Sequence, residues 1–462
     1  MSRSRRVAVI GAGVSGLTAA YRLRREFGDD ITIDVYDEAD RPGGLLRMAD
    51  VGGTAADVGA EAFIVRRPEA LQLVTELGLA DRIVSPGPLR PAIWSGAALH
   101  PLPTPALMGI PAAPASVAGL VDAADLERMA GEPDAPFAWT PGDDPSVGEL
   151  VGERFGRSVV ARSVDPMLGG VYSALADQLG LREAVPALAR ALDDGAPSLT
   201  AAVDAVLAAG ASGTGPVFGA LRGGYRELVE ALLAAGRAEV RYGTEVVGVR
   251  PGAAGVTVTL DDAAEGRAVD YDAAVIAVPI WSAARLLADA APDVASVFGD
   301  VRAAGSAVVA VAVAEETPLP EHSGVLVATD AGLRIKAVTL SSQKWPHLRS
   351  GPVRTLRTSF GRLGDPVVST DDELITASVS DLGTLFTAAG LPAPEIVDAV
   401  VQRWPGGLPH YAPGHLARVR EAFAAVPGRI GVAGSGYAGV GVPACIGTAE
   451  AAVAGITAYL HT

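Results

Sequence analysis

The pattern of apolar and polar positions predicts an α/β unit at the N-terminus. Residues 7–10 form a short apolar run, and residues 14–27 repeat apolar positions at helical spacing. Residues 31–37 then alternate as a second strand would. A strand, a helix and a second strand in this order predict two parallel strands joined by a crossover helix.

Two later parts of the chain carry similar patterns. The first, residues 221–282, predicts a turn, a helix and buried strands, with a single strand over 238–251. The second, residues 428–462, predicts a strand, a glycine-rich turn and a closing helix. Because other material separates these signals, we expect one nucleotide-binding domain assembled from three segments.

The material between these segments has a different character. Residues 84–145 are dense in proline, which predicts neither long helices nor central strands there. Helical patterns begin after Ser146, a candidate N-cap, and continue to about residue 210. Strands and helices alternate over residues 283–404, as expected of a separate substrate domain.

Composition narrows the possible partners and location. A net charge of −16 argues against nucleic acid, because phosphate contacts need clustered Lys and Arg. The single cysteine, Cys445, excludes an intrachain disulfide and a cysteine zinc cluster, and no metal site is expected. We find no signal-peptide pattern and no run of 18 uninterrupted apolar residues, and expect a cytoplasmic protein with at most peripheral membrane contact.

A glycine fingerprint indicates a dinucleotide. Gly11, Gly13 and Gly16 form GxGxxG between the first strand and helix, where they allow a tight turn, a close pyrophosphate and helix–strand packing. Asp37, 21 residues after Gly16, is placed to accept a ribose hydroxyl and to repel a 2′-phosphate. NAD and FAD both remain open at this point. The predicted loop contacts are Gly11, Ala12, Gly13, Val14, Ser15, Gly16 and Asp37.

Two further motifs favour FAD. "DEADRPGG" (37–44) resembles the E-x-x-x-R-x-G-G extension of flavin amine-oxidase-type proteins. In it, Arg41 can pair with phosphate while Gly43 and Gly44 let the chain pass close to the cofactor. "GSGYAGVGVPACIGTAEAA" near the C-terminus matches the flavin segment of the same superfamily. A helix starting near Ala444 would direct N–H groups toward the flavin.

Ordered segments along nearly the whole chain carry a more specific resemblance. They include "DVGAEAFIVRRP" (57–68), "DPMLGGVYSALADQLGL" (165–181) and "WPGGLPHYAPGH" (404–415). In these segments the chain resembles the oxygen-dependent protoporphyrinogen and coproporphyrinogen oxidases of haem biosynthesis. Where the family often has "GPDSF", this chain has "GAEAF", so only backbone contacts to the flavin are expected at Ala60 and Ala62. Further cofactor contacts implied by the resemblance are Gly59, Ala60, Glu61, Ala62, Val246, Trp404, Gly441, Val442, Pro443 and Ile446.

The resemblance also implies substrate contacts. Arg67 matches the basic residue that pairs with a porphyrinogen propionate, Gly169 and Gly170 match the backbone facing the macrocycle, and Tyr172 is a candidate pocket residue. No general base stands out, and His410 and His415 are expected to fix a turn rather than to catalyse. Cys445 is expected to be a small buried residue, with FAD held non-covalently.

The implied fold is α/β, with a discontinuous FAD-binding Rossmann-like domain, a mixed α+β substrate domain and a helical domain. The expected FAD-binding segments are 1–83, 216–284 and 405–462. Residues 84–215 are expected to form a helical, proline-rich cap or membrane-association-type domain, and residues 285–404 the substrate-binding domain.

The implied activity is a six-electron oxidation of a porphyrinogen in three steps, which reduces three O2 to three H2O2. The absence of a targeting sequence and the segment "SVDPMLGGVYSA" favour coproporphyrinogen III over protoporphyrinogen IX. A downstream chelatase is a candidate partner. Other readings of the same fold are a flavin amine oxidase, a carotenoid desaturase and a non-enzymatic escort-type protein.

Overall fold

A five-stranded parallel sheet is built from three distant parts of the chain. The computed structural model describes residues 5–210, 215–252, 254–261 and 266–461. The strand order is β12-β2-β1-β16-β22, and all four pairings are parallel. The strands are β1 (Arg5–Ile10), β2 (Ile31–Tyr36), β12 (Glu239–Arg241), β16 (Ala273–Ile276) and β22 (Ile430–Val432). The expected α/β class and the assembly of this sheet from separated segments are confirmed.

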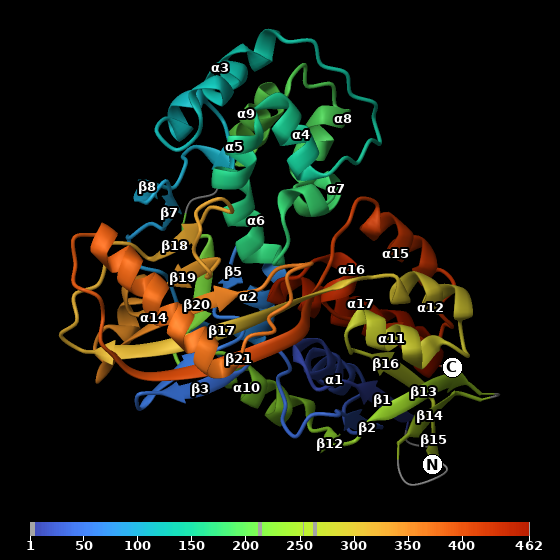
Figure 1. Ribbon diagram of the computed structural model, residues 1–462. Helices are drawn as coiled ribbons and strands as arrows, with labels where there is room; N and C mark the ends of the chain where they lie inside the picture. The colour runs from blue at the N-terminus through green and yellow to red at the C-terminus, as the bar shows by residue number, and fades with distance from the viewer. Residues whose placement is uncertain (1–4, 211–214, 253, 262–265, 462) are drawn as a thin grey trace.

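Both faces of the parallel sheet are covered, which explains its unbroken apolar strands. Val7 and Val9 pack in one core with helices α1 (Val14–Phe27), α10 (Arg226–Gly236) and α17 (Val442–Leu460). Ala8 and Ile10 pack in the opposite core, because side chains alternate along a strand. That second core is covered by an antiparallel sheet and two helices (Figure 1): β13 (Val246–Pro251), β14 (Val256–Leu260), β15 (Arg267–Tyr271), α11 (Ile280–Leu287) and α12 (Pro292–Gly299).

Helix α17 is, within the described residues, the one helix long and apolar enough to cross a membrane, with a mean hydropathy of 1.2. It packs against α1 and β22, and residues such as Ile446 and Ile456 belong to the core beneath the sheet. Glu450 of α17 forms an ion pair with Arg22 of α1. Its apolar composition is therefore accounted for by its place in the core.

The single strand predicted over residues 238–251 is wrong. The segment forms two strands that belong to different sheets, β12 at the edge of the parallel sheet and β13 in the antiparallel one. Gly243 between them has a φ of +59°, a conformation that bends the chain and that suits glycine. An uninterrupted apolar alternation concealed this turn.

The second large sheet of the protein has seven strands, in the order β21-β17-β20-β19-β18-β7-β8. Helix α14 (Asp371–Ala388) covers one face and lies across it in Figure 1. Its Ser378 hydroxyl is 2.7 Å from that of Thr358 in β20. The strands are β21 (Ile396–Pro409), β17 (Ala303–Ala314), β20 (Val353–Phe360), β19 (Ala337–Thr339), β18 (Gly324–Val327), β7 (Ala92–Ser95) and β8 (Ala98–Pro101).

The prediction that residues 84–145 hold no central strand is also wrong. All four residues of β7 are buried, and β7 lies between β18 and β8. Pro91 precedes the strand, and the strand itself contains no proline. All of its N–H groups are therefore free to pair. Strands β7 and β8 thus join the seven-stranded sheet, although they lie in the segment expected to form the helical domain.

The helical region stands above the sheets in Figure 1. As predicted, Ser146 caps α4 (Val147–Arg154), accepting a hydrogen bond of 3.1 Å from the Glu149 N–H. A π-helical turn, Val160–Val164, leads into α6 (Asp165–Tyr172). Neighbouring helices are α3 (Ala123–Gly131), α7 (Leu181–Ala184), α8 (Pro186–Asp193) and α9 (Leu199–Gly210).

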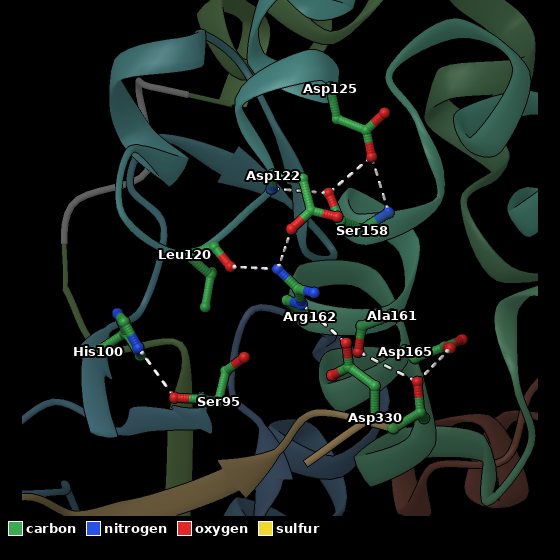
Figure 2. Close-up of polar contacts among 11 residues, drawn as sticks. Ser95, His100, Leu120, Asp122, Asp125, Ser158, Ala161, Arg162, Asp165 and Asp330 are labelled. Carbon is green, nitrogen blue, oxygen red and sulfur yellow. Dashed lines mark hydrogen bonds and ion pairs between the residues drawn. The ribbon is translucent and has the colours of Figure 1, made fainter. Parts of the chain in front are cut away.

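Ion pairs fix this π-helical turn to the seven-stranded sheet. Figure 2 shows Arg162 between Asp122, which precedes α3, and Asp330, which follows β18. The Thr329 hydroxyl donates to the carboxylate of Asp165, the first residue of α6, at 3.2 Å. The loop after β18 therefore holds the start of α6 in place.

Candidate functional site

The glycines of the fingerprint have two different roles. A Cβ atom on Gly16 would lie 1.8 Å from the Gly11 carbonyl oxygen, and one on Gly11 would lie 2.6 Å from that of Ala277. Packing alone therefore requires these two glycines. Gly13 differs, because its nearest neighbour would be Gly44 Cα at 4.0 Å. The space beside Gly13 is open in the protein itself.

The N-terminus of α1 lies at this open space. Gly13 is its N-cap and offers no side chain to the first-turn N–H groups. The Asp37 carboxylate accepts hydrogen bonds from the backbone N–H of Ala12 (2.5 Å) and Ala39 (2.8 Å), which fixes the loop. An uncapped helix N-terminus beside a fixed glycine loop is an anion-binding arrangement.

The "DRPGG" motif lies directly against the fingerprint. Gly13 and Gly43 form a β-bridge, and the Gly43 N–H donates to the Ala12 carbonyl at 2.8 Å. The Arg41 guanidinium donates to the carbonyl oxygens of Pro42 and Gly44 and thus holds its own turn. Its predicted phosphate contact stays a prediction.

The C-terminal motif meets the same place. Helix α17 begins at Val442 with Gly441 as an N-cap that offers no side chain, close to the predicted start at Ala444. The Ser15 hydroxyl donates to the Cys445 carbonyl at 3.1 Å, which joins the first turns of α1 and α17. The predicted contacts Val442, Pro443 and Ile446 are buried around this junction.

Val246 comes from the second segment of the chain and lies near Asp37. It opens β13 and is buried, and the nearby Thr244 N–H donates to the Asp37 carbonyl at 2.9 Å. The structure thus brings together the fingerprint loop, Asp37, Gly43, Gly441 and Val246 from all three segments.

The segment from Gly59 to Ala62 lies between this glycine cluster and the seven-stranded sheet. The indole N–H of Trp404 in β21 donates to the Val58 carbonyl at 3.1 Å. A Cβ on Gly59 would be 3.2 Å from the Trp404 ring and 1.8 Å from the Leu45 carbonyl oxygen. Arg357 of β20 donates to the Gly59 carbonyl at 2.7 Å. Trp404 and Gly59, both predicted site residues, are therefore in contact.

The carboxylate of Glu61 lies against two cations of the protein, Lys344 and Arg357. This carboxylate accepts from the Lys344 ammonium and the Ser341 hydroxyl, each at 2.8 Å, and lies 3.7 Å from Arg357. Burial works to raise the pKa of Glu61, but the two cations and the hydrogen bonds outweigh it and lower the pKa to about 2. Burial raises the pKa of nearby Asp57 to about 7.

Strand register defines a second surface of the site. Residues paired across neighbouring strands share a sheet face. The Gln402–Val308–Ser359–Ala337–Leu326 row crosses the face opposite α14, beside the Trp404–Ser306 pair. Apart from Val308, these side chains are partly exposed. We call this row with Trp404 and Ser306 the sheet floor.

Helix α6 borders the sheet floor. A Cβ on Gly170 would contact Leu326 Cδ2 at 3.9 Å, and Gly170 itself is exposed. The ring of Tyr172, at the end of α6, lies 5.9 Å from that of Tyr411, and burial raises the pKa of Tyr172. The predicted residues Gly169, Gly170 and Tyr172 thus lie on one helix at the edge of the floor.

Arg67 lies apart from the sheet floor, and His410 and His415 contact backbone carbonyls. Arg67, at the start of α2 (Pro68–Glu76), is half exposed and pairs with Glu69 at 3.4 Å. His410 and His415 each place Nε2 against a backbone carbonyl, of Gln178 at 2.5 Å and of Gly436 at 2.8 Å. These contacts fix turns, and burial lowers the pKa of both imidazoles.

Tyr411 holds the glycine loop before α17. Its hydroxyl donates to the Ser435 carbonyl at 2.6 Å and accepts from the Gly439 N–H at 2.7 Å. We expect Tyr411→Phe to leave both groups without a partner, at a cost of about 1–3 kcal/mol, and to speed cofactor dissociation. Flavin fluorescence released on dilution measures this. An unchanged release rate would show that the loop is held by other contacts.

Sequence reasoning missed Arg357, Lys344 and Tyr411. Arg357 lies in the segment "VRTLRTSF", whose positions alternate between buried and partly exposed. A cation within such a strand is a signal that could have been noticed. Tyr411 lies inside "WPGGLPHYAPGH", but nothing local shows which carbonyl it meets.

A family model described as flavin containing amine oxidoreductase matches residues 14–457. The chain belongs to this family. Among curated proteins, coproporphyrinogen III oxidase of Mycobacterium leprae is 47% identical, covering 98% of this chain and 99% of that protein. The protein of that name from Bacillus subtilis is 28% identical, covering 99% and 98%.

Two solved structures share the fold of this chain. A provisionally named protoporphyrinogen oxidase from Exiguobacterium sp. 255-15 has a TM-score of 0.85 and 26% identity, covering 99% of each chain. Cyclohexylamine oxidase from Brevibacterium oxydans has a TM-score of 0.72 at 18% identity, covering 99% of this chain and 100% of the other, and supports the fold alone.

A flavin fits the residues present in this family member. The space beside Gly13 and the two uncapped helix N-termini suit the phosphates of a dinucleotide. The contact of Trp404 with Gly59 places an aromatic ring of the sheet floor next to the segment that leads from the glycine cluster. The chain is a flavin-dependent oxidoreductase.

Proposed function

We propose that this enzyme oxidises coproporphyrinogen III to coproporphyrin III, using non-covalently bound FAD and releasing three H2O2 for three O2. The observation that carries the proposal is the 47% identity, over nearly the full length of both chains, to a protein named coproporphyrinogen III oxidase. The sheet floor supports it, because a broad, partly exposed face suits a large macrocyclic substrate.

The residues of the chain have distinct tasks in this reaction. Bound FAD supplies the two-electron acceptor for each of the three oxidation steps. The fingerprint loop and the first turns of α1 and α17 would hold its phosphates and ring. Trp404 and the sheet floor orient the macrocycle, and α6 excludes water from one edge. Each step removes a hydride from a meso carbon together with one proton. Over the three steps, two of the protons come from pyrrole nitrogens and the third from the remaining meso carbon, and formation of the aromatic porphyrin favours the sequence.

Cys445 supports non-covalent binding. The thiol is buried in α17, and burial raises its pKa to about 11. It stays protonated at neutral pH and is a poor nucleophile for a flavin link. Acid precipitation of the purified enzyme should leave all yellow colour in the supernatant, whereas colour in the pellet would contradict non-covalent binding.

A side-by-side assay tests the substrate. We expect porphyrin fluorescence to develop faster from coproporphyrinogen III than from protoporphyrinogen IX at equal concentration, with three H2O2 per porphyrin. The Exiguobacterium structure keeps protoporphyrinogen IX as the second candidate, which a reversed preference would favour. Inactivity on both, with FAD bound, would overturn the porphyrinogen proposal.

The same experiment separates the remaining readings. Peroxide formation from primary amines alone would indicate an amine oxidase. Tyr437, which comes just before Gly439 and Gly441 in the chain, packs against Phe298 and Phe423 in the core and does not line the floor, so it supplies no aromatic ring to an amine there. Purification without flavin would favour an escort-type protein.

A further inference from the structure

A buried pair of cations lies where α6 ends against the seven-stranded sheet. The Lys336 side chain is 7% exposed, and its ammonium donates to the Ser173 hydroxyl (2.6 Å) and the Gly361 carbonyl (2.8 Å). Arg362 follows directly after Gly361 and is partly exposed, although its Nε atom is buried. The two charges are close enough for Arg362 to lower the pKa of Lys336, after burial, to about 7.

Neither cation has an acidic partner of its own in the described part of the chain. No ion pair within 4.0 Å involves Lys336 or Arg362 among the residues that the structure describes. The Arg362 Nε atom is buried without a hydrogen-bond partner in that same part of the chain. Asp165 and Asp365 act on Arg362 only through longer-range electrostatics. The Asp165 oxygens already accept from the Ala176 N–H and the Thr329 hydroxyl.

Two like charges buried together are unfavourable unless something compensates them. The acceptors of Lys336 are a hydroxyl and a carbonyl, which carry no net charge. An anionic ligand would supply the missing charge, and a carboxylate suits both an ammonium and a guanidinium. The pair therefore has the chemistry of an incomplete anion site.

The pair lies at the margin of the sheet floor. Arg362 Nε would be 3.8 Å from a Cβ on Gly169 of α6. A Cβ on Gly361 would be 3.3 Å from the Cα of Ser306, a floor residue. The Lys336 N–H donates to the Ser359 carbonyl at 2.8 Å, and Ala337 belongs to the floor row. A macrocycle on the floor would bring a substituent of its rim to this pair.

We propose that Lys336 and Arg362 bind a propionate that coproporphyrinogen III carries and protoporphyrinogen IX lacks, and thereby select between the two. This inference rests on the proposed function. Coproporphyrinogen III has four propionates, and protoporphyrinogen IX has two neutral vinyl groups in place of two of them. A vinyl group at this position leaves both buried cations uncompensated, and sites built for a polar group reject such analogues strongly.

Arg362→Gln is the first test. It removes a charge and breaks no side-chain hydrogen bond that the described residues make, so the variant should fold. We expect kcat/KM for coproporphyrinogen III to fall about 30-fold or more, through KM, with less than about threefold change for protoporphyrinogen IX. Lys336→Met should act in the same direction. Arg334→Gln, an exposed cation two residues from Lys336, is the matched control and should change neither substrate.

A binding measurement removes dependence on turnover. Coproporphyrin III should raise the melting temperature of the wild-type holoenzyme and do so much less in Arg362→Gln. Equal losses on both substrates, or an unchanged response to coproporphyrin III, would overturn the carboxylate site. A wild type that oxidises neither porphyrinogen overturns the proposed function instead, and the coproporphyrin III titration then still tests the cation pair.

Discussion

Gly13→Ala should give a folded protein that purifies without flavin. The methyl group enters the open space beside Gly13, where, of the described residues other than its chain neighbours, only Gly44 Cα comes as close as 4.0 Å. The fold therefore has room for it, and an Ala N-cap in place of Gly costs about 1 kcal/mol. A dinucleotide does not have room, because its pyrophosphate must approach this backbone. We expect loss of more than about nine-tenths of the flavin absorbance, with the circular dichroism spectrum retained.

Two other glycines supply the controls for this experiment. Gly455→Ala changes a glycine of α17 with nothing within 4 Å and should keep full flavin content. Gly16→Ala places a Cβ 1.8 Å from the Gly11 carbonyl oxygen and should lose folding and flavin together. If Gly13→Ala bound flavin at full stoichiometry, the space beside Gly13 would not be the phosphate site.

The parallel sheet was predictable because its signals are local. Both faces of β1 are buried, so its apolar run is continuous, and the fingerprint glycines follow at once. The order of the strands was not predictable from such runs. Residues 239–241 and 430–432 reach the sheet edges through pairings that no local pattern encodes.

The two wrong predictions of strands, at β7 and at the turn between β12 and β13, each have a physical reason. Proline was counted over residues 84–145 as a whole, although its effect is confined to the residue it occupies and its neighbours. The four residues of β7 escape that effect and pair with β18, more than 200 residues later. The turn at Gly243 was likewise hidden, because a single glycine between two alternating runs leaves the period unchanged.

The candidate site divides in the same way. Glycine motifs marked the cofactor side, because close backbone approach needs a particular residue type at a particular position. The sheet floor depends on register between β17, β20 and β21, which a sequence without its pairings does not reveal. Lys336 and Arg362 are ordinary surface residue types by composition, and only the burial of Lys336 and of the Arg362 Nε atom distinguishes them.

Glu61→Gln should destabilise the enzyme strongly at neutral pH and much less in acid. The Glu61 side chain is mostly buried, and its folded-state pKa of about 2 lies below the ordinary value of 4.5. A depressed carboxyl pKa contributes stability that is fully present above pH 4.5 and is lost as the pH falls toward 2. The shift corresponds to about 3 kcal/mol. Glutamine also leaves the charges of Lys344 and Arg357 without their anion.

The effect should reach the cofactor through Arg357. This side chain donates to the Gly59 carbonyl and is held on its other side by Glu61, so losing the carboxylate frees the backbone beside Trp404. Thermal unfolding followed by flavin fluorescence should therefore show a melting temperature several degrees lower for Glu61→Gln than for wild type at pH 7, with the difference shrinking below pH 4.5. Glu316→Gln, an exposed carboxylate, should match wild type throughout. A deficit in Glu61→Gln that stayed constant down to pH 3 would mean that its packing, and not its charge, supports the fold.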